Sequence, residues 1–80
     1  MKIPRDISGV GLARLLSRYG YQITRQTGSH LRLTTRQNGE HHVTIPSHPS
    51  LRVGTLGAIL TEIADHLSKE KQTLIKELWG

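Results

Sequence analysis

Residues 21–45 read YQITRQTGSHLRLTTRQNGEHHVTI, and the fold class follows from this stretch. Apolar and polar residues alternate within it in three short runs, which are residues 21–26, 29–36 and 41–45. Such alternation is typical of β-strands that bury one face. The pairs Thr27-Gly28 and Asn38-Gly39 separate the runs, and Asn-Gly is a strong hairpin signal. The stretch therefore predicts an antiparallel three-stranded meander with one polar face.

Helical periodicity flanks this stretch on both sides. Apolar residues spaced i, i+3, i+4, i+7 predict a helix over residues 7–19 and a second helix that starts at Gly54. Asp6 or Ser8 can cap the first helix, and Ser68 can cap a third. The order α-β-β-β-α with a C-terminal helix predicts an α+β fold. We expect one domain over residues 1–80, with its core at about 7–67 and the C-terminal helix at about 68–79.

Strict alternation assigns the strand side chains to two faces. Tyr21 and Ile23 should face the helices, whereas His30 and Arg32 should lie on the polar face. Arg25 falls on the Tyr21 side, unless a bulge near Thr27-Gly28 turns it over. Alternation alone therefore does not fix the face on which the Arg25 side chain lies.

Composition narrows the classes of function. The chain of 80 residues has no cysteine, which excludes disulfide scaffolds, zinc ribbons and thiol nucleophiles. The formal net charge is +5, of which residues 1–54 carry +6 and residues 55–80 carry −1. A basic half favours a polyanionic partner, with nucleic acid first. No apolar run approaches the length of a membrane span, so we expect a cytoplasmic protein that does not contact membrane.

The five histidines raise the question of a metal site. His41 and His42 are adjacent on a strand, so they point to opposite faces and cannot easily ligate one ion. With no cysteine and no suitable carboxylates nearby, we expect no metal and no other cofactor. His41, His42, His48 and His66 are expected to be solvated polar surface.

His30 differs from the other histidines in its position. It follows the Gly28-Ser29 turn and begins a strand on the polar face, where its ring can be reached. An imidazole beside arginines can move a proton during phosphodiester cleavage, and guanidinium groups can stabilise the charge that develops. From the residues alone, the favoured alternative is a surface histidine that merely hydrogen-bonds phosphate or the loop.

Three motifs in order closely resemble the HicA family, small mRNA-cleaving toxins of bacterial and archaeal toxin–antitoxin pairs. The matching segments are Leu15-Leu16-x-x-x-Gly20-Tyr21-x-x-x-Arg25-Gln26-x-Gly28-Ser29-His30, Val43-Thr44-Ile45-Pro46-x-His48 and Gly54-Thr55-Leu56-x-x-Ile59-Leu60. The resemblance implies a fold like that of a double-stranded-RNA-binding domain. It also implies metal-independent endoribonuclease activity that inhibits translation and growth.

The same resemblance implies site residues and partners. The histidine of the Gly-Ser-His motif maps to His30 as the catalytic residue, with Gly28, Ser29, Arg25 and Arg32 as RNA contacts. The implied partners are mRNA and a HicB antitoxin, with DNA reached only through the antitoxin. The second helix lacks the lysine cluster usual in duplex-RNA binders, so single-stranded RNA stays open as the substrate. A non-catalytic RNA-binding module and a purely protein-binding domain are the alternative functions.

Overall fold

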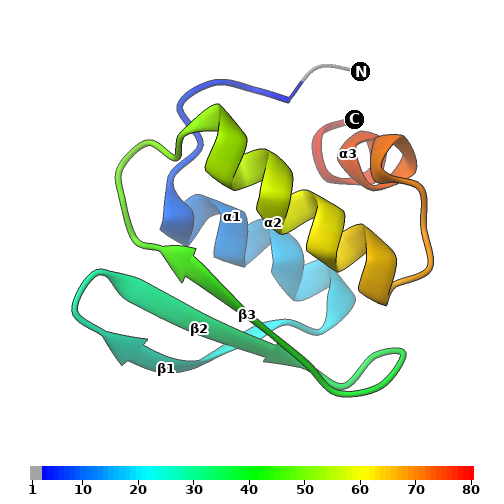
Figure 1. The fold of residues 1–80 in the computed structure, drawn as a ribbon, viewed down its shortest axis with the longest axis horizontal. Helices are drawn as coiled ribbons and strands as arrows, with labels where there is room; N and C mark the ends of the chain where they lie inside the picture. The colour runs from blue at the N-terminus through cyan, green and yellow to red at the C-terminus, as the bar shows by residue number, and fades with distance from the viewer. Residues whose placement is uncertain (1–2) are drawn as a thin grey trace.

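The computed structural model describes residues 3–80, which form an α+β fold with helices on one side of a sheet (Figure 1). The elements in chain order are α1 (Gly9–Leu16), the 3-10 helix η1 (Ser17–Tyr19), β1 (Gln22–Thr27), β2 (His30–Thr35), β3 (His41–Pro46), α2 (Val53–His66) and α3 (Lys71–Trp79). The predicted α-β-β-β-α order with a C-terminal helix is confirmed.

The three strands pair antiparallel in the order β1-β2-β3. Both predicted turns form where expected, because Gly28, Asn38 and Gly39 all adopt the left-handed backbone that tight turns require. Alternate residues of β2 and β3, such as Leu31 and Ile45, are buried against the helices. The sheet therefore has one face packed on the core and one face open.

Helix α1 begins two residues later than the sequence predicted. The hydroxyl of Ser8 accepts a hydrogen bond from Gly11 N at 2.9 Å, so Ser8 rather than Asp6 is the cap. The helix tightens into η1 and ends at Gly20, whose left-handed φ of 81° is typical of a glycine that ends a helix. Leu12 and Leu16 are fully buried beneath it.

Ser68 does not cap a third helix, contrary to the prediction. It has a left-handed φ of 57° just after α2 ends, and its N–H donates to Asp65 O at 3.2 Å. Helix α3 begins three residues later and buries Leu74, Ile75 and Leu78. This apolar stripe therefore packs within the chain.

A group of polar contacts fastens α3 to η1. Tyr19 donates from its hydroxyl to Glu77 Oε1 at 2.5 Å, and Lys69 Nζ lies 3.1 Å from Glu77 Oε2. Burial, reinforced by the Glu77 carboxylate, raises the pKa of Tyr19 to about 12. The hydrogen bond from Tyr19, followed by that from Lys69, lowers the pKa of Glu77.

The edge strand β1 departs from strict alternation. A bulge between Ile23 and Arg25 shifts its register against β2. Ile23 still pairs with buried Leu33, yet it is 49 % exposed, so its predicted burial with Tyr21 is wrong. The reason is its position at the sheet edge, which α1 covers only in part.

Candidate nucleic-acid interface

The open face of the sheet carries polar and basic side chains. We call this surface the open face. It comprises the residues of β2 and β3 that alternate with the buried ones, together with their neighbours on β1. These residues are Thr24, Arg25, Thr27, His30, Arg32, Thr34, His42 and Thr44. All of these side chains are exposed except Thr34, which is half-buried. The helices lie on the opposite side of the sheet (Figure 1). A long polymer can therefore reach this surface without any part of the fold moving aside.

His30 stands at one end of the open face. The left-handed Gly28 reverses the chain in front of it, and a Cβ at Gly28 would meet nothing within 4 Å. The neighbouring Ser29 is held through its carbonyl, which accepts from Ser47 N at 2.7 Å. Within residues 3–80, the His30 side chain forms no hydrogen bond or ion pair. The imidazole is thus exposed on an anchored turn, with both ring nitrogens available.

The bulge in β1 settles the direction of Arg25. Arg25 pairs directly with Arg32, and directly opposed residues of an antiparallel pair share one face. Both guanidinium groups therefore lie on the open face, beside the row of Thr27 and His30. The bulge is at residues 23–25 and not near Thr27-Gly28, where the sequence suggested one.

Neither arginine has a carboxylate partner in the described part of the chain. Like charges directly opposed on a sheet cost stability, by an amount of the order of 0.2–1 kcal/mol. Two unpaired arginines in register are consequently an unfavourable arrangement for the free chain. An anion placed between Arg25 and Arg32 would relieve the repulsion and accept forked hydrogen bonds from both.

His42 shares the open face with His30, as predicted, but it is engaged. Its Nδ1 lies 2.7 Å from Thr34 Oγ1, and its Nε2 lies 3.0 Å from Glu40 Oε2. Thr34 Oγ1 is in turn 2.8 Å from Thr24 Oγ1. A chain of hydrogen bonds thus fixes the ring of His42, whereas His30 has none.

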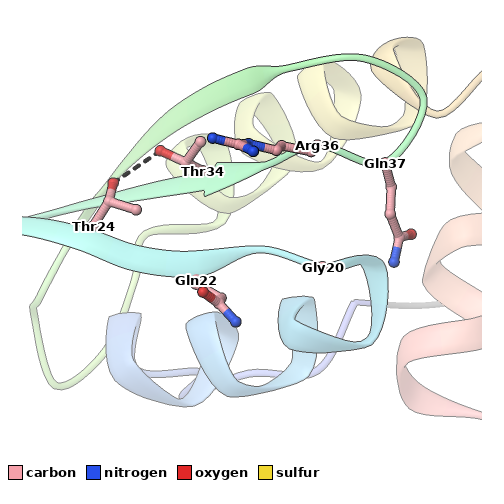
Figure 2. A pocket seen from close by; sticks show the side chains of 6 residues that line it. All are labelled: Gly20, Gln22, Thr24, Thr34, Arg36 and Gln37. Carbon is pink, nitrogen blue, oxygen red and sulfur yellow. Dashed lines mark hydrogen bonds between the residues drawn. The ribbon is translucent and has the colours of Figure 1, made fainter.

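A hollow of about 580 Å³ lies at the end of the sheet remote from His30 (Figure 2). It is lined by Gly20, Gln22, Thr24, Thr34, Arg36 and Gln37. Figure 2 shows the hydrogen bond between Thr24 and Thr34 along its floor and Arg36 beside Thr34. Arg36, the last residue of the alternating run 29–36, extends the basic surface beyond the residues named as RNA contacts.

His41 and His66 are not solvated surface, so that prediction is wrong. On the helix side of the sheet, the His41 ring lies 2.7 Å from the Tyr21 hydroxyl through Nδ1 and 3.0 Å from Glu62 through Nε2. His66 stacks on His41 with centroids 4.4 Å apart and donates from Nε2 to the carbonyls of Gln37 and Gly39. These two imidazoles fasten the β2–β3 turn to α2 and are unavailable to a substrate.

Two other kinds of site are absent from the described part of the chain. Among residues 3–80, no three His, Asp or Glu side chains gather closely enough to hold a metal ion. No helix in the same range is long and apolar enough to cross a membrane.

The arrangement of helices over a three-stranded antiparallel sheet is that of a domain similar to the double-stranded-RNA-binding fold. Residues 12–64, about two thirds of the chain, match the family model described as HicA toxin of bacterial toxin-antitoxin. The chain belongs to the HicA toxin family, as its motifs indicated. No curated protein and no solved structure gives a significant match. The matched segment contains the whole sheet, and hence His30 and both arginines.

Proposed function

We propose that this chain is an endoribonuclease toxin that cleaves mRNA at its open face, with His30 transferring a proton. Family membership makes the chain a toxin of a toxin–antitoxin pair. The proposal adds the reaction, its substrate and the residue. It also takes residues 1–80 as one HicA-like domain that acts on RNA in the cytoplasm.

The pair of opposed arginines carries the proposal. Arg25 and Arg32 face each other without a carboxylate, on the surface from which the free imidazole of His30 projects. Glu40 is the acidic residue closest to this surface in sequence, and His42 already binds it. A phosphodiester is the anion that matches both the forked donors and the neighbouring proton carrier.

The chemistry needs little beyond these groups. Ribose carries its own nucleophile, the 2′-hydroxyl, which can attack the adjacent phosphorus. Imidazole is the side chain best suited to exchange a proton with an oxygen near neutral pH. Arg25 and Arg32 would stabilise the additional negative charge that the phosphorus centre acquires in the transition state. Gly28 and Ser29 would contact the backbone of the RNA at the turn.

A toxin with this exposed face requires a covering partner. We propose a HicB antitoxin that carries acidic groups against Arg25 and Arg32 and covers His30. Charge complementarity of this kind speeds association and excludes RNA from the same surface. Contact with DNA would occur only through the antitoxin.

The test compares the wild-type chain with His30→Ala and His42→Ala on a mixed-sequence RNA in the presence of a chelator. His30→Ala should abolish cleavage and growth inhibition. His42→Ala is the matched control, because it removes an imidazole from the same face and should leave cleavage largely intact. Circular dichroism checks that both variants fold.

Two results would contradict the proposal. If folded His30→Ala cuts RNA as fast as the wild type, the site is wrongly assigned. If the wild type binds RNA without producing fragments, the chain is a non-catalytic RNA-binding module instead.

A further inference from the structure

A second hollow, of about 340 Å³, lies at the end of β3, where Pro46 pairs with His30. It is lined by Pro46, His48, Ser50, Leu51, Arg52 and Thr55. Two of these residues are exposed and basic, and two others carry hydroxyl groups. None of its residues has a role in the function proposed above.

The sheet register fixes how close this hollow is to His30. Pro46 is the direct cross-strand partner of His30, so their Cα atoms are about 4.5–5.5 Å apart. Ser47 N bonds to Ser29 O at 2.7 Å and consecutive Cα atoms are about 3.8 Å apart, so the His48 Cα lies within about 11 Å of the His30 Cα. Two imidazole side chains at this separation can approach one phosphate from two sides.

The backbone around His48 is anchored at two points. Ser47 N donates to Ser29 O at 2.7 Å, which joins this segment to the turn that carries His30. Gly9 N donates to His48 O at 3.0 Å, which joins it to the start of α1. The relative placement of His30 and His48 is thus set by the fold.

The side chains in the hollow are available to a ligand. Within the described residues, the rings of His48 and the guanidinium of Arg52 have no hydrogen bond or ion pair. The carboxylate of Asp6 accepts a hydrogen bond from the hydroxyl of Ser50 at 3.4 Å and not from His48 or Arg52. Arg52 can therefore meet a phosphate while His48 keeps a free ring nitrogen.

We propose that this hollow binds the nucleotide on the 5′-oxygen side of the cleaved bond and that His48 is the second proton-transfer group. The inference rests on the proposed function. That function needs two proton transfers, of which His30 supplies one and His48 would supply the other. One imidazole takes the proton of the ribose 2′-hydroxyl as the 2′-oxygen–phosphorus bond forms. The other, as imidazolium, gives a proton to the 5′-oxygen as its bond to phosphorus breaks. The products are a 2′,3′-cyclic phosphate and a 5′-hydroxyl, and no other reactant is needed.

His42 is excluded from this role by its distance along the sheet. It pairs with Thr34, four residues along β2 from His30, which corresponds to about 13 Å. Its ring is also held by Thr34 and Glu40. His42→Ala is therefore the matched control, because it removes a histidine from the sheet without removing either member of the reacting pair.

The experiment uses two versions of one RNA oligonucleotide, with oxygen or sulfur as the 5′-bridging atom at the mapped cleavage site. A thiolate leaves without being protonated, so the sulfur substrate no longer needs the general acid. His30→Ala and His48→Ala should each lose about 10²–10⁴-fold in kcat on the oxygen substrate. One of the two variants, and not both, should regain most of its rate on the sulfur substrate, whereas His42→Ala should keep the wild-type ratio of the two rates.

The remaining outcomes distinguish the inference about His48 from the proposed endoribonuclease function of His30. If the wild type cleaves while His48→Ala keeps its kcat, or changes only KM, the inference about His48 is overturned and the role of His30 stands. Rescue of both variants, or of neither, would also overturn the inference. A wild-type chain that leaves both RNAs intact would overturn the proposed function and this inference together.

Discussion

Replacing Gly9 by alanine should push the start of α1 away from the end of β3. A Cβ at Gly9 would lie 1.9 Å from the backbone oxygen of Pro46, a contact that no side-chain rotation can relieve. Overpacking of this kind costs about 1–3 kcal/mol. The displacement would also break the hydrogen bond from Gly9 N to His48 O, which adds about 0.5–1.5 kcal/mol. We therefore expect Gly9→Ala to lower the free energy of unfolding by about 2–4 kcal/mol.

The matched control is Gly57→Ala in the middle of α2. A Cβ there would meet only Lys71 Nζ at 3.5 Å, which is ordinary contact, and alanine favours the helix by about 0.5–1 kcal/mol. Thermal and urea unfolding, followed by circular dichroism, measure both variants. Each kcal/mol shifts Tm by about 4–8 °C in a chain of this size, so the two variants should move in opposite directions. Equal stability of Gly9→Ala and the wild type would refute the reasoning.

Three further predictions concern the open face, α3 and the buried phenols. Arg25→Gln should stabilise the free chain slightly, because it removes the repulsion with Arg32. It should also lower the slope of log affinity for RNA against log salt concentration by about 0.7–0.9. Binding titrations at several salt concentrations measure this slope, and an unchanged slope would count against a phosphate contact. Leu74→Ala should cost about 2–5 kcal/mol in urea unfolding, because Leu74 is fully buried, and a cost near zero would mean that α3 does not belong to the core. Tyr19 and Tyr21 should ionise near pH 12 in the folded chain, since burial raises the pKa of each from 10.0 to about 12. The contribution of the two protonated phenols to the free energy of unfolding is complete below pH 10 and is lost as the pH rises through 12. Tyrosinate absorbance that appears near pH 10 in the folded chain would contradict this prediction.

The predictable part of this fold is local in the sequence. Alternation identified the three strands, and helical periodicity identified the helices that flank them. Thr27-Gly28 and Asn38-Gly39 marked chain reversals because few residues other than glycine and asparagine tolerate the backbone angles of such turns. These signals arise within a few residues of the chain, so the sequence carries them directly.

The remaining features depend on contacts between distant segments. The bulge that turns Arg25 onto the open face has no residue-type signal in β1, because it arises from pairing with β2. The absence of a side chain at Gly9 leaves room for the backbone of Pro46 at the end of β3. The stacking of His41 on His66 joins residues far apart in sequence. For the site, the sequence indicated His30 from its turn and motif, but the hollow beside it becomes visible only through the sheet register.

The most direct test of the central claim uses an RNA oligonucleotide with a single 2′-deoxy substitution at the mapped cleavage site. His30 is proposed to serve an attack by the ribose 2′-hydroxyl, so the wild-type chain should cut the all-ribose strand and leave the substituted bond intact. Equal cutting of both strands at that bond would contradict the account.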